Sequence, residues 1–241
     1  MAFQLDARQK NILEAIIKEY QKTDLPVASQ VLVEKYKFDL SPATIRAEMK
    51  ELDEKDLLAQ PHHSAGRVPT TKAYRLYVDD LIKRGEIKPR DGARIKRKLK
   101  SFDFSQMVSY QLAQVLADFS HNLGFSGLAG EEVGFQEVGW PWLLADEELR
   151  DPDIMVSVLQ GFEALERDFN NFLESVSAEI GIFIGEENPF KGLNKCSLVV
   201  SACELNDKKV LIGILGPKRM DYARNIFLVQ EIKNTLEKAR S

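Results

Sequence analysis

Residues 41–55 read SPATIRAEMKELDEK, and this stretch decides the fold of the N-terminal part of the chain. Ser41 is a good helix N-cap, and Pro42 occupies the first helical position, where its fixed φ and missing N–H do no harm. At 100° per residue, the large apolar side chains fall on one side of the helix. They are Ile45, Met49 and Leu52. The pattern predicts a helix that buries this side and turns small or basic residues outward in its first half.

Two further helices are predicted before this one and a hairpin after it. Asp6 signals the start of a first helix, and Ser29 can cap a shorter second one. Two short strands are predicted at residues 57–60 and 67–69, with a turn-rich loop between them. Three helices followed by a β-hairpin make a winged helix-turn-helix domain, which we assign to residues 1–82.

A winged helix binds DNA by placing its third helix in the major groove and its hairpin along the neighbouring backbone. Hydroxyls and freed amides at the start of that helix can bind phosphates, and Arg46 and Lys50 have the reach for guanine edges. Polar side chains of the hairpin add further contacts. We therefore predict these DNA-binding residues: Ser41, Ala43, Thr44, Arg46, Ala47, Lys50, His62, His63, Ser64, Arg67 and Thr70.

Positive charge is concentrated in a short segment after this domain. Residues 83–100 carry nine Lys and Arg side chains against two Asp and Glu, whereas residues 101–241 carry 12 against 22. The spacing of Ile95 and Leu99 predicts a helix, so we assign residues 83–104 to a basic linker helix. Its cations fit a solvated helix face and a phosphate contact about equally well.

The remaining residues, 105–241, predict an α+β domain with a small antiparallel sheet. The glycine-rich passage 124–139 is expected to hold no regular element. Helices are expected at 105–123, around 162–176 and at 220–239, and strands at 180–184, 197–203 and 210–215.

Composition excludes several classes of protein. The chain has 241 residues, of which 44% are hydrophobic and 29% charged, and no stretch approaches the ~18 uninterrupted apolar residues of a membrane helix. Its first residues lack the build of a signal peptide, so we expect a cytoplasmic protein with no membrane partner. Cys196 and Cys203 are too few for a disulfide framework or a cysteine-based zinc motif.

The sequence offers no positive signal for catalysis. His62 and His63 are adjacent and would point to opposite sides of an extended strand, and His121 lies on a different element, so no metal-ligand spacing results. No dinucleotide, P-loop or nucleophile-elbow motif occurs. We therefore expect a protein that is not an enzyme and has no metal or cofactor.

Blocks of distinctive sequence occur in both parts of the chain. The N-terminal blocks are RQKNILEAIIKEY at 8–20, PVAS at 26–29, SPATIR at 41–46, QPH at 60–62, SAGRVPT at 64–70 and YRLYVD at 74–79. The C-terminal blocks are IGEEN at 184–188, CSLV at 196–199 and GPKRMDY at 216–222. Together and in this order, they closely resemble the HrcA heat-inducible transcription repressors of bacteria.

This resemblance implies a homodimeric repressor of heat-shock chaperone genes. It implies binding to an inverted-repeat operator, the CIRCE element, and an active form that the GroE chaperonin maintains. It also implies a GAF-like second domain. Family members are typically longer, and the missing part falls after Gly130. Residues 105–241 are therefore expected to form a truncated GAF-like domain that lacks most of an inserted dimerisation domain.

The chain departs from the family pattern at several positions. Ala47 stands where the family usually has Asn, His63 where it has Thr, Ala73 where it has Gly, and Lys218 where it has Thr. Because a methyl group replaces an amide at Ala47, the operator sequence is left open.

A second hypothesis also stays open at this point. The second domain would bind a ligand or a protein, and the winged helix would not serve specific DNA binding.

Overall fold

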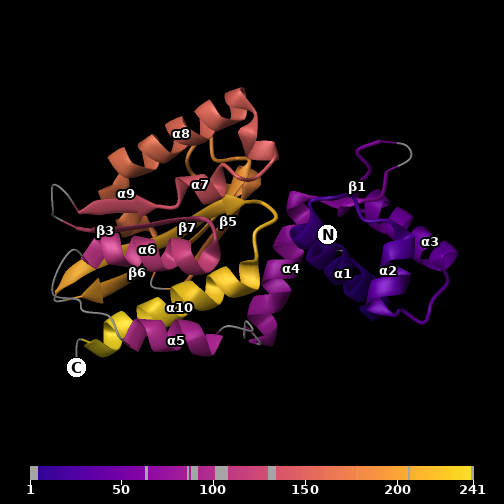
Figure 1. Cartoon of the computed structure of the whole chain (residues 1–241), viewed down its shortest axis with the longest axis horizontal. Helices are drawn as coiled ribbons and strands as arrows, with labels where there is room; N and C mark the ends of the chain where they lie inside the picture. Colours follow the sequence, from indigo (N-terminus) through magenta and orange to yellow (C-terminus); the bar gives the residue numbers. More distant parts are fainter. Residues whose placement is uncertain are drawn as a thin grey trace. The chain divides into compact units, whose positions relative to one another are not determined.

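The computed structural model describes residues 5–62, 65–85, 87, 92–100, 108–129, 134–177, 179–205 and 207–239. The chain forms two compact units, Met1–Arg84 and Gly85–Ser241 (Figure 1).

The first unit is a winged helix-turn-helix, as predicted. Its three N-terminal helices enclose a core of fully buried aliphatic side chains, among them Ile12, Ile16 and Leu32 from the first two helices and Ile45 and Leu52 from the third. A two-stranded antiparallel hairpin and a fourth helix complete it. In chain order the elements are α1 (Ala7–Thr23), α2 (Ser29–Tyr36), α3 (Pro42–Glu54), β1 (Leu58–Ala59), β2 (Val68–Pro69) and α4 (Thr71–Arg84).

A local capping signal explains the start of α1, whereas the one expected for α2 fails. Asp6 caps α1, because its Oδ1 accepts a hydrogen bond of 2.7 Å from the backbone N–H of Gln9. The prediction that Ser29 caps α2 is wrong. Ser29 is the first residue of that helix, and Ala28 stands at the cap position without a side-chain hydrogen bond.

The second unit is built on a five-stranded antiparallel sheet with the strand order β4-β3-β7-β6-β5. Its helices lie on both faces of the sheet (Figure 1), so two apolar layers form. The elements are α5 (Gly92–Lys100), α6 (Val108–Ser120), β3 (Leu123–Leu128), β4 (Phe135–Val138), α7 (Trp140–Leu143), α8 (Pro152–Arg167), α9 (Phe169–Ser175), β5 (Gly181–Ile184), β6 (Cys196–Leu205), β7 (Lys208–Pro217) and α10 (Tyr222–Ala239).

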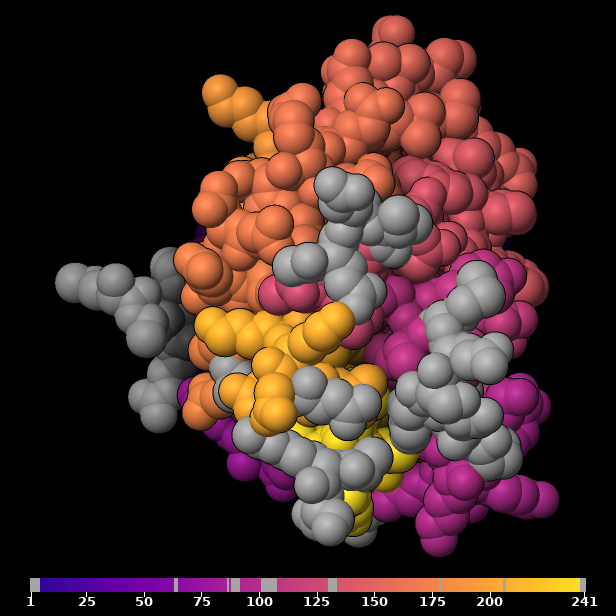
Figure 2. Space-filling model, turned by 90° about the vertical axis from the view of Figure 1, so that its left-hand side faces the viewer, coloured from indigo at the N-terminus to yellow at the C-terminus, as the bar shows by residue number. Residues whose placement is uncertain are grey.

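The two layers differ in their helices. Helices α8 and α9 cover one face, where Phe162 and Phe172 join Phe125 and Leu198 of the sheet in a buried cluster. Helices α6 and α10 cover the other face. Figure 2 looks onto one end of this unit, with atoms of α8 and α9 in salmon to orange above and those of α10 in yellow below.

The expectation of no regular element at 124–139 is wrong, because β3 and β4 lie there. The glycines that hid these strands are packing sites. A Cβ on Gly124 would come within 2.4 Å of the carbonyl oxygen of Ala113 in α6, and one on Gly127 within 2.6 Å of the Phe169 ring. Glycine therefore permits close approach of helices to a central strand here.

The predicted linker helix over 83–104 also differs from what is seen. Helix α4 extends to Arg84 in the first unit, and the next described helix, α5, packs against α10 within the second unit. Ile95 and Leu99 are buried in that contact. The basic residues of α5 are thus part of the second folded unit, because the apolar side of this helix needs a partner surface.

Candidate nucleic-acid interface

The start of α3 is capped as predicted. The Ser41 Oγ accepts a hydrogen bond of 3.1 Å from the backbone N–H of Thr44, and the two hydroxyl oxygens lie 2.8 Å apart. Pro42 occupies the first turn. The start of a helix carries the positive end of its dipole, which attracts a phosphate. Because Pro42 lacks an N–H and the Thr44 N–H donates to Ser41, the Ala43 N–H is the amide of this turn that is left to bind it.

The outer side of α3 is small and basic. Ala43, Arg46, Ala47 and Lys50 are all exposed. Arg46 has no hydrogen-bond or ion-pair partner among the described residues, whereas Lys50 lies 3.7 Å from Glu54 in a highly exposed pair. Such a pair contributes little stability, so the Lys50 ammonium is easily released. Because Ala43 and Ala47 are small, they leave room for a polyanion to come close to Arg46 and Lys50.

The inner side of α3 carries a polar network that the sequence analysis missed. Glu48 is 9% exposed; its carboxylate lies 3.1 Å from Nη1 of Arg8 and accepts a hydrogen bond of 3.3 Å from Nε2 of Gln9. The same amide of Gln9 donates to Glu51, and Lys55 donates to its oxygen, at 2.8 and 2.7 Å. The network holds α3 against α1. The sequence does indicate a buried position for Glu48, because this residue follows Ile45 by three and therefore shares the buried side of α3.

The hairpin presents His62 at an exposed position. The loop is closed by the backbone N–H of Ala65, which donates to the carbonyl of His62 at 2.9 Å, and by the side chain of Gln60, which donates to the carbonyl of Ala65 at 3.0 Å. His63 and Ser64, two further predicted contacts, lie outside the described residues.

Arg67 is not the exposed tip that we expected. Only 18% of its side chain is exposed, and its Nε lies 3.0 Å from Oδ2 of Asp53 in α3. Its backbone exchanges two hydrogen bonds of 2.9 Å with Val27. A Cβ on the neighbouring Gly66 would come within 2.3 Å of the Val27 carbonyl oxygen, so only glycine allows this approach. The base of the hairpin is therefore held against the three-helix core.

The Thr70 hydroxyl forms hydrogen bonds within the protein. Its hydroxyl donates to the carbonyls of Asp56 and Leu57, at 2.9 and 3.3 Å, and accepts from the backbone N–H of Ala73 at the start of α4. A hydroxyl has a single proton to donate, and here the protein uses it. The structure thus gives this predicted contact no spare donor for a phosphate.

Two family models match this chain. One is described as the winged helix-turn-helix transcription repressor, HrcA DNA-binding, and matches residues 4–80. The other is the HrcA protein C-terminal domain and matches residues 88–226, more than half of the chain. This chain belongs to the HrcA family. The predicted class, a winged helix-turn-helix followed by an α+β domain, is confirmed.

Individual relatives agree with the HrcA assignment. The heat-inducible transcription repressor HrcA of Natranaerobius thermophilus is 29% identical in an alignment 333 residues long, which covers 98% of this chain and 97% of that protein. The repressor of the same name from Acetivibrio thermocellus is 26% identical over 337 residues, covering 97% and 95%. Because this chain has 241 residues, both relatives carry segments without a counterpart here.

A solved structure shares the fold. It is the crystal structure of a hypothetical protein, with a TM-score of 0.74 at 20% identity, and the match covers 96% of this chain and all of that one.

HrcA proteins are heat-inducible transcription repressors rather than enzymes. No cluster of three or more potential metal-binding side chains occurs among the residues described for this member. In the same part of the chain, no helix combines the length and apolar character needed to cross a membrane.

Proposed function

We propose that this HrcA-type repressor binds an inverted-repeat, CIRCE-like operator as a homodimer, with one α3 helix in the major groove of each half-site. The observation that carries the proposal is the exposed start of α3, where a hydroxyl-capped turn is followed by Arg46, which has no partner among the residues that the structure describes. A two-fold dimer places equal surfaces on matching half-sites, which is why an inverted repeat is the expected target.

The residues of α3 divide into two roles. Ser41 and Thr44, with the backbone N–H of Ala43, bind phosphates and set the register of the helix. Arg46 and Lys50 reach base edges, where a good bidentate contact to guanine is worth about 1–3 kcal/mol of discrimination. Ala43 and Ala47 allow the helix to lie deep in the groove, and Ala47 also offers a methyl group to a thymine methyl.

The hairpin supplies contacts to the neighbouring backbone. His62, His63 and Ser64 are the proposed phosphate ligands at its tip. Arg67 acts mainly by holding the hairpin on α3 through Asp53, because most of its side chain is covered. Thr70 supports the start of α4 rather than touching DNA.

The proposed regulation follows from the family. The regulated genes would be chaperone genes of a bacterial cytoplasm, and the GroE chaperonin would maintain the active repressor. Heat would then divert the chaperonin to other clients, the amount of active repressor would fall, and the genes would be expressed.

A gel-shift titration tests the proposal. The probe is a duplex carrying an inverted repeat found upstream of this gene or of chaperonin genes, with a random duplex as competitor. We expect competition-resistant binding that weakens steeply with salt, because each neutralised phosphate adds about 0.9 to the log–log slope. Weak, sequence-blind association would overturn the proposal and favour a ligand- or protein-binding module. Light scattering at micromolar concentration tests the dimer, and a monomer that still binds the full operator tightly would contradict it.

A further inference from the structure

Helix α5 carries an unusual concentration of positive charge for a helix that is packed into a folded unit. Its nine residues include five cations and no acidic side chain: Arg94, Lys96, Arg97, Lys98 and Lys100. Its apolar side is packed against the protein, since Ile95 and Leu99 are buried and a Cβ on Gly92 would come within 3.0 Å of the Phe227 ring in α10. The cations are therefore displayed on a fixed surface.

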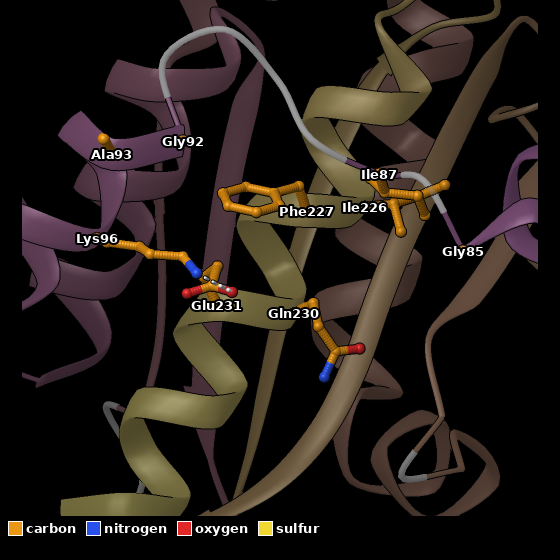
Figure 3. A pocket seen from close by; sticks show the side chains of 9 residues that line it. All are labelled: Gly85, Ile87, Gly92, Ala93, Lys96, Ile226, Phe227, Gln230 and Glu231. Atoms are coloured by element: carbon orange, nitrogen blue, oxygen red, sulfur yellow. Dashed lines mark ion pairs between the residues drawn. The ribbon is translucent and has the colours of Figure 1, made fainter.

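Some of these cations are engaged within the protein. Figure 3 shows Lys96 reaching across to Glu231 of α10, where the charged atoms lie 3.4 Å apart. The Lys96 ammonium also lies 5.6 Å from the centre of the Phe227 ring. The Arg94 guanidinium stands 5.0 Å from the centre of the Phe119 ring in α6, and Lys98 has an interaction within the protein as well. These contacts fix the orientation of α5.

The other two cations of α5 are Arg97 and Lys100. Both are exposed, and neither has a hydrogen-bond or ion-pair partner in the described part of the chain. They are three residues apart, so they lie on the same side of the helix about 4.5 Å apart along its axis. On the helical wheel they are opposite Ile95 and therefore point away from α10.

The rest of the second unit makes this surface distinctive. Residues 101–241 carry 12 basic and 22 acidic side chains, whereas α5 carries five basic and no acidic ones, so the net positive charge of α5 contrasts with the net negative charge of residues 101–241. A solvated helix face normally mixes both signs, whereas a one-sign surface fits a polyanion.

We propose that the outward side of α5, centred on Arg97 and Lys100, binds phosphates of duplex DNA next to the half-site that α3 occupies. This inference rests on the proposed operator binding. The eight peptide steps from Arg84 to Gly92 span at most about 29 Å, which limits the distance between the end of α4 and the start of α5. Duplex DNA offers one phosphate charge per about 1.7 Å of its axis, and the contact needs no particular sequence.

The experiment compares the full-length protein with an Arg97→Gln/Lys100→Gln variant on two duplexes. One is trimmed to the inverted repeat, and the other adds about 20 bp of random sequence, two helical turns, on each side. Affinity is measured by fluorescence anisotropy at several KCl concentrations. We expect the log–log salt slope of the variant to fall by up to about 1.8 per protomer on the long duplex, about 0.9 for each lost phosphate contact. The slope on the trimmed duplex should equal that of the wild type.

The chain offers a matched control. Arg167 and Lys191 are exposed and have no partner in the part of the chain that the structure describes, so Arg167→Gln/Lys191→Gln removes the same charge elsewhere on the second unit. This variant should keep the wild-type slope on both duplexes. Thermal unfolding should be unchanged in both variants, because all four side chains are exposed.

The remaining outcomes of this experiment overturn either the inference about α5 or the proposed operator binding. A wild-type slope for the α5 variant on the long duplex, with specific operator binding intact, overturns this inference alone. An equal loss in the control variant, or an equal loss on the trimmed duplex, also overturns it, since net charge or contacts within the operator would then explain the effect. If the wild-type protein binds neither duplex specifically, the proposed operator binding itself fails.

Discussion

The Nε atom of Arg67 lies 3.0 Å from Oδ2 of Asp53, and this pair joins the base of the hairpin to the last turns of α3. The two side chains are 18% and 35% exposed, so water screens the pair only in part. The two elements proposed to touch DNA, the helix and the wing, are thus held in one geometry by a contact between residues that are far apart in the sequence.

The first prediction concerns this pair. Arg67→Ala and Asp53→Ala should weaken binding to operator and to random duplex by similar factors, because each lets the hairpin move relative to α3. A double-mutant cycle on urea unfolding should give a coupling of about 0.2–1 kcal/mol, typical of a partly exposed ion pair. If Arg67 instead binds a phosphate directly, Arg67→Ala will weaken DNA binding while Asp53→Ala will not.

The second prediction concerns base readout by Arg46. Arg46→Ala should lower operator affinity by about 1–3 kcal/mol and relax the sequence preference, because a bidentate contact to guanine is lost. The measurement is competitive gel shift against operator variants. Lys10→Ala, an exposed cation on α1, is the matched control and should change little. An equal loss on operator and random DNA for Arg46→Ala would remove this residue from base readout.

The third prediction separates the capping role of Ser41 from its role toward phosphate. Ser41→Ala should cost about 1 kcal/mol of unfolding free energy, because the amide of Thr44 loses its acceptor. Ser41→Asp keeps a capping oxygen, so stability should be retained. Its negative charge should repel the phosphates of DNA and weaken DNA binding. Unchanged DNA affinity for Ser41→Asp, measured beside its thermal unfolding, would place the start of α3 away from phosphates.

The fourth prediction concerns acid stability. Glu19 in α1 is 4% exposed; the hydrogen bond from Lys35 of α2 lowers the pKa of its carboxyl below the ordinary 4.5, although burial acts in the opposite direction. Since the pKa is lower in the folded than in the unfolded state, this carboxylate stabilises the fold above pH 4.5, and the stabilisation is lost as the pH falls through the folded pKa.

Urea unfolding between neutral pH and about pH 3 tests this fourth prediction. The stability difference between wild type and Glu19→Gln should shrink on acidification. Lys50→Gln, which affects a highly exposed pair on α3, should give a smaller and flatter difference. A wild-type advantage over Glu19→Gln that grows as the pH falls would contradict the assigned direction of the pKa shift.

The sequence alone determined the parts of this protein that depend on near neighbours along the chain. The cap at Ser41, the start at Pro42 and the buried side of α3 follow from interactions within one or two turns, which leave a readable pattern. The exposed positions of Arg46 and Lys50 follow from the same periodicity. The distinctive blocks then indicated the HrcA family, to which the chain belongs.

Only the tertiary structure decided the contacts between distant segments. Nothing local pairs Arg67 with Asp53 or Gln9 with Glu48, because those partners meet only after α3, α1 and the hairpin have packed together. The strand through Gly124 and Gly127 was missed for a related reason. Glycine is a poor strand former by itself, and its place in β3 is set by α6 and Phe169 lying against it. Local patterns thus determined the surface proposed to recognise DNA, and long-range packing determined how it is held.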